Sequence, residues 1–532
     1  MVAALSLFGL WGCGGGGESS DTTSSKAATE EAAGETDIVS SVSDMGKGDI
    51  VLLSFSGGSS SLSFSGSQAG MEYQLIVQST TEAQSTSTLT LGDEGVPIPS
   101  LGKALLAEEP PDVHADFEAM LRATEAELAD QGALPLPSVG KSIAPAVAVG
   151  DTANFRVLKS LTSTAVYSEV AATAKCVTSR VALFVDDVVK TELPDVMSTE
   201  DYASLCSKFD DTLKTEFAIL GDPPDINGDG SVTVLMTPKV NALGGSGGGI
   251  VTGFFFAGDL LGNSSSNPAS NQREIVHVLY PDPNGVFGSK LSKDFTMGNL
   301  LTAVVPHEVQ HLLSYYYHVL VNGGSSEQAW LNEGMSHLIE DVVGYGQENP
   351  SREALFLNAT AASSVVTSGS PSLTQRGGIY LFMRFLYEQA GSNGSAFLKN
   401  LVQANRTGST NLVQAFGTDN EAFNSLPEFL RRWGVALVAT DAGVTTDARY
   451  IYKARTKNET TGHWHGVCLV CDAEDGRSTS LAGPTVSAYS SGKAVSLSTT
   501  GSALFSISSA PSSITLLGSE STDLQGVLLR TK

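Results

Sequence analysis

The stretch His307-Glu308-Val309-Gln310-His311 decides which fold and chemistry are expected of this 532-residue chain. Residues four positions apart lie on one face of a helix, so the two imidazoles can reach a single tetrahedral Zn²⁺ ion. Glu308 stands beside the first histidine, where it can accept a proton from a metal-bound water. The helix is expected to be buried, because apolar residues flank it on both sides: Leu300, Leu301, Val304, Val305, Leu312 and Leu313.

A second segment, Trp330-Leu331-Asn332-Glu333-Gly334-Met335-Ser336, offers a third metal ligand. The intervening Gly323-Gly324-Ser325-Ser326 favours a chain reversal, after which a second helix can bring Glu333 back to the histidines. Two histidines and a glutamate with one position open for water form the thermolysin-like type of catalytic zinc site. We therefore expect His307, His311 and Glu333 to hold zinc.

The two motifs, HEVQH and WLNEG, resemble those of the gluzincin zinc metallopeptidases, and most of all the hyicolysin family of secreted bacterial metallopeptidases. The resemblance runs from about residue 150 to about residue 440 and includes the Ala182–Asp187 strand and a helix around Tyr380–Met383. It implies an α+β fold in which a thermolysin-like zincin core, a mixed sheet with active-site helices, is flanked by small all-β modules. It also implies that Glu308 is the general base and that Zn²⁺ is the cofactor.

Pro306 departs from the related sequences, which usually have a helix former at this position. Proline inside a helix removes a hydrogen bond and costs about 3 kcal/mol or more. We expect the helix either to begin near Pro306 or to kink at the metal. Both arrangements keep the two histidines on one face.

A further side chain besides zinc is needed to stabilise the oxyanion that develops during peptide hydrolysis. The gluzincin resemblance implies a His or Tyr from a later helix, and Tyr380 is the first candidate, followed by Arg376 and His337. Packing in the core beside Leu381 and Phe382 explains Tyr380 equally well. A buried structural role is the alternative for His337.

Composition divides the chain into segments with different expected roles. Residues 14–47 are rich in Gly, Ser, Thr, Ala and Glu, and such a segment cannot offset the entropy of ordering. The expected segments are a lipoprotein-type signal peptide at 1–13, a flexible low-complexity tether at 14–47, a small β module at 48–110, a helical linker at 111–145, the zinc metallopeptidase domain at 146–445 and a C-terminal β-rich module at 446–532.

Periodicity predicts the secondary structure of these segments. Short alternating runs separated by Gly and Ser predict strands in both β modules. The shared face of Phe117, Met120, Leu121 and Leu128 predicts a helix at about 112–131. In the central domain we expect mostly helices from 295 to 440, preceded by a helix near 199–219 and strands near 153–158, 180–186, 232–236, 250–257 and 274–280.

The amino end of the chain resembles an export signal. Val2–Trp11 is an apolar run too short to span a bilayer, and it ends at Leu10-Trp11-Gly12-Cys13, which resembles the lipobox of bacterial lipoproteins. No Lys or Arg precedes Cys13, and Trp11 is bulky where a small residue is usual, so a disordered apolar terminus is the alternative. We expect an exported monomer at the bacterial cell envelope or surface, or secreted, whose membrane contact is a lipid on Cys13.

The four later cysteines, Cys176, Cys206, Cys468 and Cys471, are an even set in a chain that is expected to be exported. Such a set indicates disulfides, and sequence order favours Cys176–Cys206 and Cys468–Cys471 among the three possible connectivities. The alternative for the second pair is a zinc site shared with the histidines of His463-Trp464-His465.

Asp225, Asn227 and Asp229, followed by Gly230, reproduce the first half of an EF-hand-like Ca²⁺ loop. The twelfth position of such a loop supplies a bidentate Glu, and here it is Met236. The same residues also form an ordinary turn before a strand. A weak calcium site and a plain turn are both compatible with the sequence.

The charge balance restricts the partners, since 57 acidic residues against 31 basic ones give a net charge of -26. Such a chain repels phosphate backbones, so we expect no nucleic-acid partner. The sequence predicts a secreted, lipid-anchored zinc endopeptidase that acts on protein or peptide substrates. The alternative is a cell-surface binding or adhesion lipoprotein with a vestigial or structural zinc site. Glu308 favours the enzyme, because zinc binding alone does not require a base.

Overall fold

The structure is a computed structural model that describes residues 34–65, 70–93, 113–131, 146–245, 249–417, 423–473, 479–509, 511–518 and 523–532. The expected signal peptide, the lipidation site Cys13 and the first part of the tether lie outside the described residues. The description below concerns the unit Ala33–Lys532. Within the described residues, no helix has the length and apolar character needed to cross a bilayer.

A six-stranded mixed sheet with the order β5-β6-β7-β8-β10-β9 carries the central domain. Its middle strands pair in parallel and every residue in them is buried, which explains their continuous apolar sequences: β7 (Val181–Asp186), β8 (Val232–Met236) and β10 (Ile275–Val278). The flanking strands are antiparallel: β5 (Thr152–Leu158), β6 (Tyr167–Val177) and β9 (Gly253–Phe255). β9 is an edge strand, and this edge lies beside the site described below.

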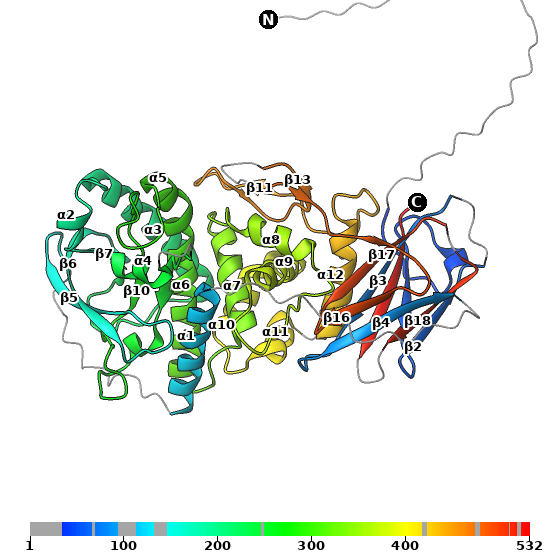
Figure 1. Cartoon of the computed structure of the whole chain (residues 1–532), viewed down its shortest axis with the longest axis horizontal. Helices are drawn as coiled ribbons and strands as arrows, with labels where there is room; N and C mark the ends of the chain where they lie inside the picture. The colour runs from blue at the N-terminus through cyan, green and yellow to red at the C-terminus, as the bar shows by residue number, and fades with distance from the viewer. Residues whose placement is uncertain are drawn as a thin grey trace, which may run out of the picture. The chain divides into compact units, whose positions relative to one another are not determined.

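Helices pack on this sheet and continue away from it as a helical layer (Figure 1). α6 (Leu301–Tyr315) contacts α3 (Thr199–Leu220), β9, β10 and α7 (Ala329–Val342). The layer continues with α8 (Asn349–Leu357), α9 (Leu373–Gln389), α10 (Gly394–Val402), α11 (Gly408–Phe416) and α12 (Leu426–Ala439). The shorter helices of the domain are α2 (Val189–Glu192), α4 (Pro238–Gly244) and α5 (Lys293–Phe295). The chain is thus a mixed α+β protein.

Pro306 lies inside α6, which begins at Leu301, so the helix does not start at the proline. Wider π-helical turns flank α6, with η3 (Thr296–Leu300) before it and η4 (Tyr316–Val321) after it. Turns of this kind occur frequently at functional sites. All residues of α6 are buried, as the apolar flanks predict.

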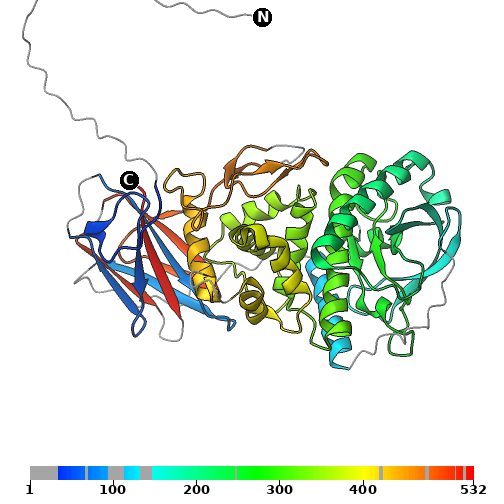
Figure 2. The same cartoon turned by 180° about the vertical axis from the view of Figure 1, so that it is seen from behind.

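The two β-rich ends of the chain form one sandwich instead of two separate modules at 48–110 and 446–532. One sheet has the order β1-β19-β3-β17-β15 and the other β16-β4-β18-β2, so both sheets combine amino-terminal and carboxy-terminal strands (Figures 1 and 2). The strands are β1 (Ile50–Ser54), β2 (Ser59–Ser63), β3 (Tyr73–Ser79), β4 (Thr86–Asp93), β15 (Ser487–Ala488), β16 (Ala494–Ser498), β17 (Ser502–Ile507), β18 (Ser513–Gly518) and β19 (Leu524–Arg530). Their apolar core draws on both ends, because neither end alone supplies two complete sheets.

The sandwich is anchored on the last helix of the helical layer. Ile76 and Val527 pack against Val435 of α12 in a separate apolar cluster. Gln78 Nε2 donates a buried hydrogen bond of 2.8 Å to the carbonyl oxygen of Leu430. The sandwich is therefore joined to the helical layer through α12.

α1 (Val113–Asp130) forms where a helix was expected, but it does not behave as a linker. Phe117 and Leu121 are buried in the same apolar cluster as the central sheet and α6. The ring of Phe117 meets that of Phe254 edge-on, with centroids 5.2 Å apart. α1 is therefore part of the central domain, although its sequence lies outside the predicted domain boundary.

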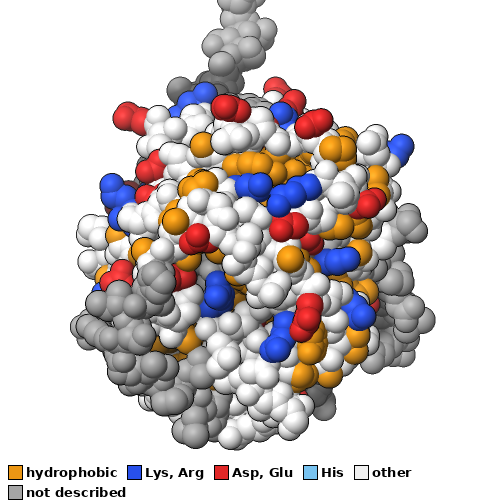
Figure 3. All heavy atoms as spheres, turned by 90° about the vertical axis from the view of Figure 1, so that its left-hand side faces the viewer, with side chains coloured by type: hydrophobic (Ala, Val, Ile, Leu, Met, Phe, Trp, Pro, Cys, Tyr) orange, Lys and Arg blue, Asp and Glu red, His pale blue; other side chains and the backbone are white. Residues whose placement is uncertain are grey.

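Acidic and basic side chains are interspersed on the end of the molecule seen in Figure 3, which corresponds to the left-hand side of Figure 1. On the described part of that face the excess of acid is not gathered into one patch.

Glu216 on α3 provides a stability prediction, because it is fully buried and neither carboxylate oxygen has a hydrogen-bond partner among the described residues. Burial raises the pKa of Glu216 well above 4.5, so its ionised form opposes folding, and stability is lost as the pH rises above 4.5. Glu216→Leu should therefore raise the free energy of unfolding at pH 8 by about 1 to 3 kcal/mol. Urea denaturation at pH 8 and pH 4 measures this, and the gain should shrink at pH 4. Asp211→Leu, an exposed change on the same helix, is the control and should change stability by less than about 0.5 kcal/mol.

Candidate metal centre

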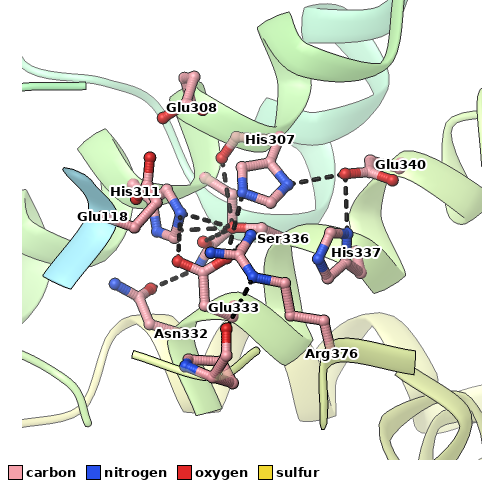
Figure 4. A network of polar contacts seen from close by, with 12 residues as sticks. Glu118, His307, Glu308, His311, Asn332, Glu333, Ser336, His337, Glu340 and Arg376 are labelled. Carbon is pink, nitrogen blue, oxygen red and sulfur yellow. Dashed lines mark hydrogen bonds and ion pairs between the residues drawn. The ribbon is translucent and has the colours of Figure 1, made fainter. Parts of the chain in front are cut away.

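His307 and His311 on α6 and Glu333 on α7 come together as the sequence predicts (Figure 4). His307 Nε2 lies 3.4 Å from Glu333 Oε2, and His311 Nε2 lies 3.3 Å from Glu333 Oε1. Metal–ligand bonds of about 2.0 to 2.1 Å in a tetrahedron separate neighbouring donor atoms by about 3.4 Å. Two imidazoles and a carboxylate at these separations fit Zn²⁺ by donor type and by spacing.

Two glycine positions explain how the chain returns Glu333 to the histidines. Gly323, in the turn after η4, has a φ of 63°, which glycine adopts without strain. Gly334 follows Glu333 directly, and a Cβ atom at this position would lie 2.5 Å from Ile379 Cγ2. Glycine therefore allows α7 to approach α9 closely, and this approach fixes the position of Glu333.

Glu340 is a site residue that the sequence analysis missed. Its Oε1 atom lies 2.7 Å from His307 Nδ1 and 3.0 Å from His337 Nδ1. A carboxylate on Nδ1 orients the ring and leaves Nε2 free for a metal. Glu333, His337 and Glu340 share one face of α7, at spacings of four and three residues. That spacing is the sequence signal from which Glu340 could have been found.

His307, His337 and Glu340 also form a second group of donor atoms that are close enough to hold a cation. This group uses His307 Nδ1, whereas the first uses His307 Nε2. Because Nδ1 faces a carboxylate that fixes the ring, we assign the metal to the first group.

The electrostatics favour a positive charge between Glu333 and the histidines. Burial lowers the pKa of His311, and the Arg122 guanidinium lowers it further, so this imidazole is neutral and can bind a metal. Burial acts in the same direction on His307, but Glu333 and Glu340 outweigh it and raise its pKa to about 10. Where a proton is held this strongly between carboxylates, a metal cation is also stabilised.

The edge strand β9 of the central sheet holds the side chain of Glu308 in position. Its Oε2 atom accepts a hydrogen bond of 2.9 Å from the backbone N–H of Phe255 in β9. Burial raises the pKa of Glu308 to about 8, and the nearby Glu118 carboxyl contributes to the increase. A carboxylate with a raised pKa is a stronger base, which suits general-base catalysis near neutral pH.

Two of the three candidates for oxyanion stabilisation line the cavity beside the metal ligands, and the third does not. Arg376 and His337 line this cavity together with Glu308, whereas Tyr380 lines a different cavity near Asp341. The structure therefore does not bring Tyr380 to the metal group, since it lies one turn further along α9 than Arg376.

Arg376 and His337 each have a buried nitrogen atom without a hydrogen-bond partner among the described residues. Arg376 Nη1 lies 2.8 Å from Glu333 Oε2, while its Nη2 has no hydrogen-bond partner in the described part of the chain. His337 Nε2 also lacks such a partner. Burial lowers the pKa of His337 to about 4, so its ring is neutral, and Nδ1 donates the single ring proton to Glu340. His337 Nε2 is therefore an acceptor, and Arg376 is the available donor beside the metal group.

The cysteines are joined as sequence order favours. Cys176 of β6 is bonded to Cys206 of α3, with Cα atoms 6.3 Å apart, and Cys468 is bonded to Cys471, with Cα atoms 6.2 Å apart. Thiolates committed to a disulfide cannot ligate zinc, so the structure does not support the alternative zinc site with His463 and His465.

The loop at Asp225, Asn227 and Asp229 is closed by its own hydrogen bonds. Asp225 Oδ1 accepts from the N–H of Gly230 at 3.1 Å, and Asn227 Oδ1 accepts from the N–H of Asp229 at 3.2 Å. Among the described residues, metal-binding groups of His, Cys, Asp and Glu occur only around His307. The hydrogen bonds account for this loop as a turn before β8, and nothing in the structure supports calcium there.

Glu340→Gln tests whether the Glu340 carboxylate holds His307. The change removes the charge but keeps the side-chain length, so we expect zinc affinity to fall about 10- to 100-fold. Competition with a chromophoric chelator measures this affinity. Glu348→Gln, a change at another glutamate that lines the same cavity, is the matched control and should leave the affinity unchanged. Unchanged zinc affinity in Glu340→Gln would contradict the positioning role.

The fold and the site define a mixed α+β protein with a His₂Glu group that fits a metal. No protein-family model and no curated protein matches the chain. Similar solved structures include native leukotriene A4 hydrolase from Saccharomyces cerevisiae, at 10% identity and a TM-score of 0.28 over 50% of this chain and 41% of that chain. A second structure of the native yeast enzyme matches at 11% identity and a TM-score of 0.28, over 52% of this chain and 44% of that chain. This chain thus matches less than half of their length, and the assignment of the site depends on its own geometry.

Proposed function

We propose that the chain is a zinc-dependent peptidase of the gluzincin type, which hydrolyses internal peptide bonds in protein or peptide substrates. The observation that carries the proposal is the arrangement of His307, His311 and Glu333 at zinc-ligand spacing, with Glu308 buried beside them. The proposal includes export and a lipid anchor on Cys13, which depend on the amino-terminal sequence alone. The similarity of the two motifs to the hyicolysin family supports the same reading.

The residues of the chain have distinct parts in hydrolysis. Bound zinc would polarise the scissile carbonyl and make water more acidic. Glu308 accepts the proton of the attacking water at Oε1, while Oε2 stays fixed by the N–H of Phe255, and it then transfers the proton to the leaving nitrogen. Arg376 stabilises the negative charge that develops on the carbonyl oxygen. The edge strand β9 would pair with an extended substrate through its outward backbone groups other than the N–H of Phe255, which donates to Glu308.

The test measures zinc content and casein hydrolysis by the purified full chain. α1 packs into the same domain and could limit access to the metal group. The Leu121→Asp variant, which weakens the packing of α1, is therefore assayed in parallel. We expect about one zinc per chain, cleavage that 1,10-phenanthroline abolishes, and recovery when zinc is restored. Zinc binding without cleavage in either protein would instead favour a surface binding protein. Absence of zinc in both proteins would contradict the assignment of His307, His311 and Glu333 as zinc ligands.

A further inference from the structure

α1 buries charged side chains beside the metal centre. Glu118, Arg122 and Glu125 follow each other at spacings of four and three residues on one face of α1, and their exposures are 0%, 7% and 2%. Arg122 Nη1 lies 3.1 Å from Glu125 Oε1, and Nη2 lies 3.7 Å from Glu118 Oε2. A helix that only filled the core would place apolar residues at these positions, because buried charges are costly even when paired. The polar face therefore indicates that α1 covers a polar surface.

That polar surface is the metal centre itself. Figure 4 shows Glu118 beside His311, on the side of the site away from Arg376. The charge of Glu118 acts on Glu308, and the charge of Arg122 acts on His311. α1 therefore lies within electrostatic range of both the proposed base and the metal ligands.

The apolar face of α1 is held against the edge of the central sheet. Phe117 packs edge-on against Phe254 of β9, and α1 also contacts η2 (Ala257–Leu260), which follows β9. β9 is the strand whose outer edge would pair with an extended substrate, and its Phe255 holds Glu308. α1 thus combines contacts to the substrate-pairing strand with a carboxylate directed to the metal ligands.

We propose that α1 is an intramolecular inhibitor that blocks access to the metal group on the side away from Arg376, with the Glu118 carboxylate beside His311, where part of a bound substrate would lie. The inference depends on the proposed peptidase function. Cleavage then requires a state in which α1 has moved away from β9. The fraction of chains in that open state sets the apparent affinity for any ligand of the cleft.

Hydrogen exchange on the unmodified, zinc-loaded chain tests this inference without an activity measurement. A peptide hydroxamate, which binds zinc and lies along a peptidase cleft, is the probe. We expect the amides of Val113–Asp130 to lose protection when the hydroxamate binds, because the two occupants exclude each other. Binding of the hydroxamate with unchanged protection of α1 would overturn the inference and leave the peptidase proposal intact. A chain that binds no zinc would overturn both.

Two variants with the same new side chain separate release of α1 from a general charge effect. Leu121→Asp places a carboxylate at a buried position of α1, and Ala123→Asp places one at an exposed position of the same helix. We expect Leu121→Asp to bind the hydroxamate about tenfold more tightly or better and to cleave peptides correspondingly faster, with Ala123→Asp unchanged. Should circular dichroism show that Leu121→Asp is unfolded, Glu118→Ala is expected to give the same direction of change. Equal hydroxamate affinity in folded variants and the unmodified chain would contradict the inference.

Discussion

Glu308→Gln should reduce kcat for peptide hydrolysis about 10³-fold while the variant keeps about one bound zinc. Glu308 is next to His307 in the chain but is not among the three donors at ligand spacing, so the metal does not depend on it. An amide of the same size cannot take a proton from water. Steady-state assays with a fluorogenic peptide, together with metal analysis of the same samples, measure both quantities.

The same variant should fold normally. The carbonyl oxygen of the new amide can still accept the hydrogen bond of 2.9 Å that Phe255 donates to Oε2. Burial raises the pKa of Glu308 from 4.5 to about 8. The ionised side chain is therefore less stable in the folded chain than in the unfolded chain, and the free energy of unfolding falls as the pH rises from 4.5 to 8. After zinc removal, the melting temperature of the Gln variant at pH 8 should therefore equal or exceed that of the unmodified chain.

Glu308→Asp serves as the companion variant, because it retains a carboxylate but shortens the side chain by one methylene group. It should retain more activity than Glu308→Gln and an acidic limb in its pH–rate profile. Retention by Glu308→Gln of more than about a tenth of the activity would show that another group is the base.

Most of the central domain could be predicted from local patterns. The apolar run at Val232–Met236 is β8, and the periodic segment near 199–219 is α3, because burial on two faces or on one stripe leaves a direct trace in the sequence. The spacing of the two motifs was sufficient to predict that His307, His311 and Glu333 lie close together. β6 was not predicted, since its mixture of Ala, Thr, Glu and Lys lacks a strong apolar alternation.

The sandwich was not predictable as one body, because strand pattern does not encode which strand is the partner. Ile50 of β1 pairs with Leu529 of β19, and Leu504 of β17 pairs with Ile76 of β3. Each strand alone resembles any half-buried strand. Only the combined requirement for a closed core joins the two ends of the chain.

The environment of the candidate metal site was predicted less completely than the three side chains that would ligate the metal. Glu118, Arg122 and Glu125 have the sequence pattern of a solvated helix face, and only the tertiary structure shows that this face is buried. Tyr380 and Arg376 lie one turn apart on α9, so sequence alone could not decide which of them faces the cavity. The burial of this face of α1 and the choice between Arg376 and Tyr380 both depend on distances between helices, and such distances leave no periodic pattern in the sequence.

Glu333→Gln should reduce the zinc content of the purified chain below about a tenth of that of the unmodified protein. Glu333 is the only carboxylate in the ligand set, and its Oε2 atom also lies 2.8 Å from Arg376 Nη1. The amide is a poor ligand, and it leaves the Arg376 cation facing an incoming Zn²⁺ without a compensating charge. Both effects act against metal binding, so the loss of affinity should exceed that of Glu340→Gln. Metal analysis after dialysis against buffered zinc measures it.

Breaking a buried ion pair also lowers stability by about 3 to 5 kcal/mol, so the loss of zinc must be separated from partial unfolding. Glu388→Gln is the matched control, because Glu388 Oε1 forms another buried pair with Arg384 Nε at 2.8 Å on α9. It should lose comparable stability in urea denaturation but keep its zinc, since Glu388 is absent from the metal-binding groups of the described residues. Equal zinc loss in both variants would attribute the effect to stability. Zinc loss in Glu333→Gln alone identifies the Glu333 carboxylate as a ligand.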